Sequence, residues 1–74
     1  MPDNNTPRYV PAQASFTEPT GEHVENSWGV LDTVENTFAP FGGGKELAEF
    51  AAQRVAERPY LPWSFLPDFT LTNA

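Results

Sequence analysis

The 74-residue sequence contains no cysteine and only one histidine, so neither a disulfide nor an ordinary zinc site is available to stabilise a small fold. Isoleucine is also absent. Apart from Met1, the large apolar side chains are five Val, five Leu, six Phe, two Trp and two Tyr. Small domains with so few of these side chains usually depend on a disulfide, a metal or a partner. We therefore expect one domain at most, ordered by partner chains.

Positive charge is scarce, since four Lys and Arg stand against ten Asp and Glu, which gives a net charge of -6. This charge repels phosphate backbones and anionic lipids, so we expect no direct binding to nucleic acid. No uncharged run approaches the roughly 18 residues of a membrane-spanning helix. The first ten residues also lack the basic and then apolar pattern of a signal peptide. We expect an intracellular protein without a membrane span.

The first 21 residues are rich in proline, at positions 2, 7, 11 and 19. Proline fixes its own φ angle and favours extended geometry in the residue before it. The pattern predicts an extended N-terminal arm over residues 1–21. Its largest apolar side chains, Tyr9 and Phe16, are candidates for contact with a partner.

The central residues, 22–58, have helical periodicity. Large apolar residues recur at spacings of four, three, three and four, namely at Val24, Trp28, Leu31, Val34 and Phe38. This spacing predicts a helix over about 27–38. Pro40 and three glycines then interrupt the pattern, and residues 45–58 form a second expected helix without glycine or proline. The expected fold is therefore mostly irregular, with a helix–loop–helix centre between proline-rich extended arms.

The last 16 residues, 59–74, are the most apolar part of the chain and contain prolines at 59, 62 and 67. A chain stiffened by proline loses less entropy on docking than a flexible one. We interpret this tail as a strip that docks into a groove of a partner. The alternative is that Trp63 and Phe65 fold back onto the helices as the protein's own core.

Residues with chemical potential do not form a catalytic pattern. Residues 42–45, G-G-G-K, lack the other positions of a phosphate-binding loop and fit a linker into the second helix. His23 has no second histidine or cysteine with which to hold a metal, and we expect it to be solvated. Asp32 and Glu35 lie one helical turn apart, where a solvated helix face is the expected environment. The P-x-x-P spacing of residues 59–62 lacks a correctly placed basic residue. We expect no enzyme activity, cofactor or metal.

Together these features favour a non-catalytic structural accessory protein that staples a larger protein assembly in multiple copies. A virion component, such as a capsid, portal or tail accessory protein, is the leading hypothesis. A minor subunit of a multi-subunit enzyme complex and a small acidic regulator or inhibitor of a host enzyme are the alternatives. The residues expected to contact the partner are large and apolar: Tyr9, Phe16, Trp28, Leu31, Tyr60, Leu61, Trp63, Phe65, Leu66 and Phe69.

Overall fold

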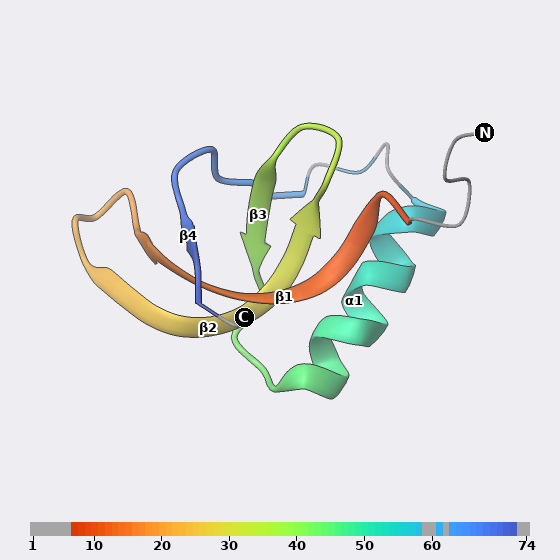
Figure 1. Cartoon of the computed structure of the whole chain (residues 1–74), viewed down its shortest axis with the longest axis horizontal. Coiled ribbons are helices and arrows are strands. Elements are labelled where there is room, and N and C mark those ends of the chain that lie inside the picture. The colour runs from red at the N-terminus through yellow and green to blue at the C-terminus, as the bar shows by residue number, and fades with distance from the viewer. Residues whose placement is uncertain (1–6, 59–60, 62, 73–74) are drawn as a thin grey trace.

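The described part of the chain is built around an antiparallel β-sheet. The computed structural model describes residues 7–58, 61 and 63–72, and in these ranges it contains four strands and one helix (Figure 1). The elements are β1 (Tyr9–Thr17), β2 (His23–Asp32), β3 (Thr37–Pro40), α1 (Lys45–Glu57) and β4 (Thr70–Leu71). The strand order in the sheet is β3-β2-β1-β4.

Strands β1 and β2 form a long hairpin, with Val10 opposite Leu31. The loop between them begins with a tight turn, in which the N–H of Gly21 donates to the carbonyl of Glu18 at 2.7 Å. Pro19 follows Glu18, and Gly21 has a φ of 96°. Proline in the second position and glycine in the fourth are typical of a type I turn. This turn reverses the proline-rich segment and starts β2.

A β-bulge bends this hairpin near its loop. The register shifts between Ala14 and Phe16 on β1, where Glu25 and Asn26 of β2 lie opposite the single residue Ser15. Asn26 has a φ of 55°, a left-handed conformation that asparagine tolerates better than most residues. A bulge increases the local bend and twist of a hairpin. Both strands curve strongly in Figure 1, so the sheet has a concave and a convex face.

A four-residue loop joins β2 to β3, since Asp32 pairs with Thr37. The N–H of Asn36 donates to the carbonyl of Asp32 at 2.8 Å, and Asn36 has a φ of 57°. Loops of this length are most often built around a type I turn. The loop reverses the chain in the middle of the segment expected to be helical.

Helix α1 covers the convex face. Its buried residues, Ala48, Ala51, Ala52 and Val55, lie on one side of the helix, and Ala51 and Ala52 pack with Val30 of β2. Alanine side chains let the helix approach the sheet closely. The sequence predicted this helix correctly, because its run of helix formers ends just before Pro59.

The concave face holds the main apolar core. Phe38 is fully buried there, with Phe16, Leu66 and Phe69 around it. The ring centroids of Phe38 and Phe69 lie 5.7 Å apart, and those of Phe38 and Phe16 lie 6.0 Å apart. Ala12, Ala14, Val24 and Leu31 complete this cluster.

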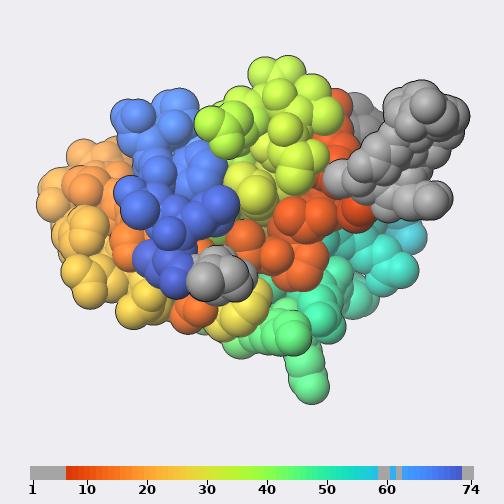
Figure 2. Space-filling model, in the orientation of Figure 1, coloured from red at the N-terminus to blue at the C-terminus, as the bar shows by residue number. Residues whose placement is uncertain are grey.

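The C-terminal segment crosses the concave face from one edge of the sheet to the other. At the β3 edge, Leu66 and Phe38 exchange two backbone hydrogen bonds, of 2.8 and 3.0 Å. At the β1 edge, β4 pairs with residues 14 and 15, and the N–H of Thr72 donates to the carbonyl of Gln13 at 2.8 Å. Figure 2 shows the segment lying between the β1–β2 hairpin and the β2–β3 loop.

The expected helix–loop–helix with irregular, partner-ordered arms is therefore wrong. Within the N-terminal arm, residues 9–17 form β1, and the helix expected over 27–38 is replaced by most of β2, a turn and β3. The C-terminal tail, from Leu61 onward where it is described, supplies Leu66 and Phe69 to the chain's own core. Pairing between distant segments overrides the local preferences of the sequence, as is usual for sheets.

Candidate functional site

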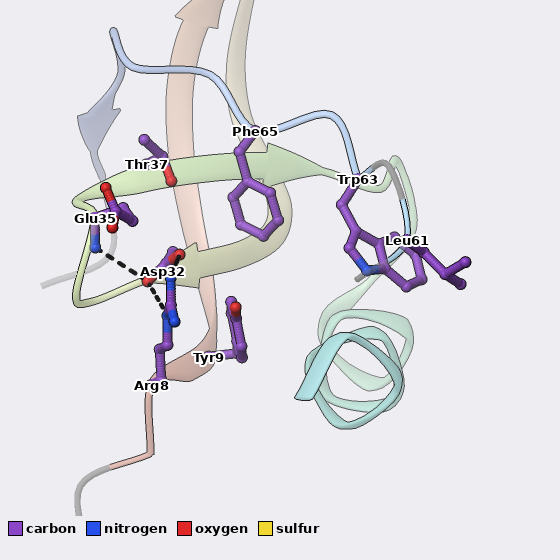
Figure 3. Close-up of a pocket in the computed structure, with 8 residues that line it drawn as sticks. All are labelled: Arg8, Tyr9, Asp32, Glu35, Thr37, Leu61, Trp63 and Phe65. Atoms are coloured by element: carbon purple, nitrogen blue, oxygen red, sulfur yellow. Dashed lines mark hydrogen bonds and ion pairs between the residues drawn. The ribbon is translucent and has the colours of Figure 1, made fainter. Parts of the chain in front are cut away.

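A groove of about 310 Å³ opens where the N-terminal end of β1 meets the segment that follows α1 (Figure 3). We call it the aromatic groove. Its apolar wall comprises Tyr9, Leu61, Trp63 and Phe65. Its polar wall comprises Arg8, Asp32, Glu35 and Thr37.

The apolar wall is fixed by contacts between rings. Tyr9 and Phe65 pack with their centroids 6.0 Å apart, and Trp63 packs on Phe41 at 6.3 Å. The indole N–H of Trp63 donates to the carbonyl of Arg58 at 2.7 Å, which anchors the ring to the C-terminal end of α1. These three groove rings are half-buried, and Leu61 is exposed. The groove therefore offers apolar surface on side chains that are already held in place.

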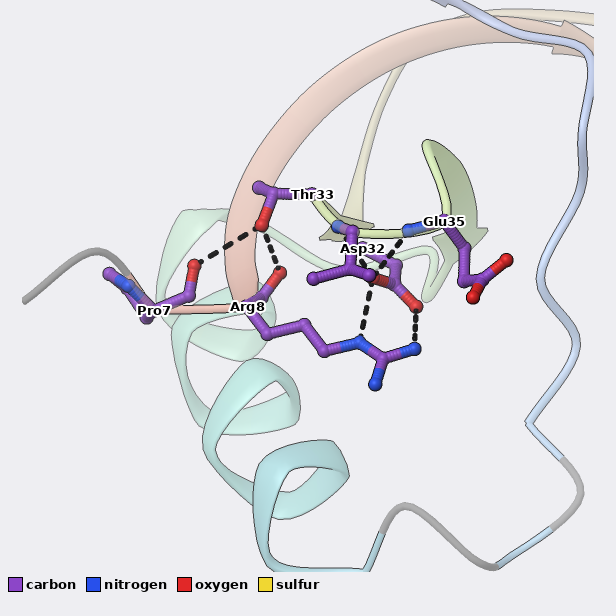
Figure 4. A network of polar contacts seen from close by, with 6 residues as sticks. Pro7, Arg8, Asp32, Thr33 and Glu35 are labelled. Carbon is purple, nitrogen blue, oxygen red and sulfur yellow. Dashed lines mark hydrogen bonds and ion pairs between the residues drawn. The ribbon is translucent and has the colours of Figure 1, made fainter. Parts of the chain in front are cut away.

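The polar wall contains a bidentate ion pair (Figure 4). Arg8 donates from Nε and Nη2 to the two carboxylate oxygens of Asp32, at 2.9 and 3.0 Å. The same carboxylate accepts the backbone N–H groups of Val34 and Glu35, at 3.0 and 3.1 Å. Thr33 completes the network, since its N–H and hydroxyl both donate to the carbonyl of Arg8. The network ties the start of β1 to the β2–β3 loop.

These contacts shift the pKa values of both members of the pair. Burial alone would raise the pKa of Asp32, but the hydrogen bonds from Arg8, Glu35 and Val34 outweigh it and lower the pKa. The hydrogen bond to Asp32 raises the pKa of Arg8. The Arg8 guanidinium also lies over the Tyr9 ring, 5.1 Å from its centroid. Asp32 is thus an anion with its oxygens already bonded, and a poor proton donor or acceptor near neutral pH.

Four of the ten residues expected to contact a partner meet in this groove: Tyr9, Leu61, Trp63 and Phe65. The residues that instead belong to or pack against the concave core are Phe16, Leu31, Leu66 and Phe69. Trp28 is half-buried on β2, and its carbonyl accepts the N–H of Phe41. Tyr60 lies outside the described residues.

The polar wall was missed by the sequence reasoning. Asp32 was expected on a solvated helix face, but it is 4% exposed and forms the ion pair with Arg8. A usable signal was present, because aspartate often accepts the N–H groups of the residues two and three positions later when it begins a turn. Glu35 is exposed, as expected. His23 is also exposed, within 3.5 Å of the Glu25 carboxylate.

Comparison with known proteins assigns the chain to no family. No protein-family model, curated protein or solved structure matches the chain. In the part of the chain that the structure describes, no helix has the length and apolar character needed to cross a membrane.

Proposed function

We propose that the chain is a non-catalytic accessory protein that binds a larger protein assembly, with the aromatic groove as its main contact surface. One observation carries this proposal: segments distant in the sequence bring Tyr9, Leu61, Trp63 and Phe65 together around one groove without burying them completely. Tyr and Trp are enriched among the residues that contribute most binding energy at protein interfaces. Their side chains are already fixed by packing, so binding costs little conformational entropy.

The chemistry of the groove favours a partner segment with an apolar or aromatic side chain beside a cationic or hydrogen-bonding group. The rings of the groove supply the apolar area that such an apolar or aromatic side chain would contact. On the polar wall, Arg8 and Asp32 neutralise each other, whereas the Glu35 carboxylate is exposed and adds negative charge. A partner with a basic surface also suits the chain's net charge of -6.

Binding accounts for the groove better than catalysis does. The lowered pKa of Asp32 and its four hydrogen bonds make it a structural anion rather than a general acid or base. Glu35 is exposed, so it lacks the burial that usually prepares a carboxyl group for acid–base work.

For the assembly itself, a virion component present in multiple copies remains our leading prediction, by analogy with other small accessory proteins. A minor subunit of a multi-subunit enzyme complex would use the groove in the same way. In both cases larger protein subunits are the partners.

A second candidate is a free-standing acidic regulator or inhibitor. It is favoured by the packing of the C-terminal segment on the chain's own sheet, since a chain that closes its own core can fold before it meets a partner. The two candidates differ in stoichiometry and in their response to salt. A regulator binds one target with an on-rate that falls as salt rises, whereas a structural component keeps a fixed copy number through salt washing.

The proposal is tested with single side-chain truncations in a tagged full-length chain, expressed in the cells in which the protein is naturally produced. Trp63→Ala and Leu61→Ala remove parts of the apolar wall, and Leu71→Ala is the matched control, because Leu71 is 48% exposed on β4. We expect Trp63→Ala to weaken association with the co-purifying partner by roughly tenfold or more. The effect of Leu61→Ala should be smaller, and Leu71→Ala should be close to wild type.

Circular dichroism of each variant separates loss of binding from loss of folding. If the folded Trp63→Ala and Leu61→Ala variants retain the partner as well as wild type does, the groove is not the contact surface. If Leu71→Ala loses the partner to the same extent as Trp63→Ala, the loss is not specific to the groove, and the groove is not the main contact surface.

A further inference from the structure

A second hollow lies at the β1–β2 hairpin end of the molecule, on the concave face. Phe16, Pro19, Pro40 and Leu66 form its apolar lining, and its volume is about 300 Å³. Glu18 also lines it. We call this site the hairpin hollow. It is distinct from the aromatic groove, since the two share no lining residue.

The segment from Trp63 to Leu66 lies between the two sites, because its residues line both of them. Trp63 and Phe65 line the aromatic groove, whereas Ser64 and Leu66 line the hairpin hollow. The bridge between Leu66 and Phe38 fixes this segment beside β3, and so fixes both walls at once.

The charge around the hairpin hollow has one sign. The hairpin carries Glu18, Glu22 and Glu25, and the sequence has no Lys or Arg between Arg8 and Lys45. Of the basic residues, Arg8 is paired with Asp32, and the other three lie on α1 or directly after it. The hairpin loop and α1 lie toward opposite ends of the molecule (Figure 1). No Lys or Arg therefore neutralises the negative potential at the hairpin, where the one other basic side chain is His23, 3.5 Å from the Glu25 carboxylate.

We infer that the hairpin hollow binds a basic protein segment, with one apolar side chain of the segment entering the hollow and flanking Lys or Arg side chains facing the hairpin glutamates. Charge complementarity selects this occupant over an acidic segment. The apolar lining requires a side chain that can displace water from Phe16, Pro19 and Leu66. With the aromatic groove as the first contact surface, this second site would let one chain bridge two protein surfaces.

The inference is tested by NMR titration of the full-length chain with three synthetic peptides: KKFKK, KKSKK and EEFEE. We expect KKFKK to shift the amide signals of Glu18, Thr20 and Ser64. Binding should weaken severalfold when salt rises from about 50 to about 200 mM. KKSKK should bind more weakly than KKFKK, and EEFEE should cause no shifts at these residues.

Three sets of variants, one of them a control, assign the effect to the hollow. Glu18→Gln with Glu22→Gln should weaken KKFKK binding by about two- to fivefold per substitution. The control, Glu46→Gln with Glu49→Gln, removes the same charge from α1 and should leave binding within twofold of wild type. Thr20→Trp, a change at an exposed loop position, should fill the hollow and abolish the shifts while the spectrum stays dispersed.

Three results would overturn the inference. Equal binding of KKFKK and KKSKK would mean that the hollow accepts no apolar side chain. Equal losses from the hairpin and α1 substitutions would mean that only overall charge matters. Shifts confined to Tyr9, Trp63 and Phe65 would place the peptide in the aromatic groove, which would support the proposed function and refute the second site.

Discussion

Replacing Phe38 by alanine tests the concave core at its centre. Phe38 is 0% exposed and packs against the rings of Phe16 and Phe69. Phe50, on the outer side of α1, is 57% exposed and supplies a matched control. The same substitution at these two positions removes the same atoms from opposite environments.

Phe38→Ala should lower the free energy of unfolding several times more than Phe50→Ala does. Phe→Ala in a packed core costs about 3–5 kcal/mol, because apolar contacts are lost and a cavity remains. At about 0.05–0.15 kcal/mol per residue, a chain of 74 residues has a free energy of unfolding of about 4–11 kcal/mol. Phe38→Ala thus removes a large share of the total stability. Phe50→Ala should change it by about 0.5 kcal/mol or less, since alanine is the better helix former and the lost contact with Arg54 is exposed.

The assay is urea unfolding at neutral pH, followed by tryptophan fluorescence and circular dichroism. With an m-value of about 1 kcal/mol/M, the midpoint should fall by about 3 M or more for Phe38→Ala, or the variant should be unfolded without urea. The midpoint for Phe50→Ala should stay within about 0.5 M of wild type. Similar midpoints for the two variants would refute the placement of Phe38 at the centre of the core.

Three further outcomes follow from the sheet and the ion pair. Gly29→Ala should lower the urea midpoint by about 2 M or more, since the added Cβ would overlap the backbone carbonyl oxygen of Ala39. The control is Gly44→Ala, which has open space around the added Cβ and should lower the free energy of unfolding by about 1 kcal/mol or less. Asp32→Asn should cost about 1–3 kcal/mol at pH 7 in the same assay, because the charged partner of Arg8 is lost; an unchanged midpoint would contradict the role of the pair. Because the folded pKa of Asp32 lies below its unfolded value of about 3.9, its stabilisation is complete above that pH and is lost as the pH falls through the folded pKa. The difference between wild type and Asp32→Asn should therefore shrink at low pH, and a difference that grew would reverse this sign.

Helix α1 could be predicted from the sequence because its signals are local. Residues 45–57 contain neither glycine nor proline, and the following proline marks the end. Four residues of the aromatic groove, Tyr9, Leu61, Trp63 and Phe65, were predicted to contact a partner because they are large apolar residues in proline-rich segments, and that contact stays a prediction. Residue type alone identified them, although the groove they form depends on the sheet.

The helix expected over 27–38 failed for a specific geometric reason. Val24, Leu31 and Phe38 are seven residues apart, which matches two helical turns. In a strand, residues seven apart point to opposite faces. The bulge at Asn26 changes this alternation between Val24 and Leu31, and the four-residue loop places Phe38 directly opposite Leu31. The bulge and the loop together bring all three side chains to one core with the spacing of a helix.

Strand β1 was hidden by its composition. Its core face is made by Ala12, Ala14 and Phe16, and alanine has little preference for strands. Pro11 also favoured an irregular arm, but proline is tolerated where a strand has a free side, and β4 pairs only with residues 14 and 15 of β1. On this side of β1, the N–H of Thr72 donates to the carbonyl of Gln13, and these two residues are 59 positions apart in the sequence. A pairing over that separation leaves no trace in local periodicity.

The placement of the C-terminal segment decides which experiments can identify a docking surface. Deleting this segment would remove Leu66 and Phe69 from the core and β4 from the edge of β1, and so would expose Phe38 to water. A truncated chain would then lose its partner because it unfolds, whichever surface binds. Trp63 and Leu61 can be shortened without removing the segment's pairing to β1 and β3, because that pairing runs through Leu66 and β4. Point substitutions in the aromatic groove therefore test binding, whereas truncation tests only whether the sheet stays closed.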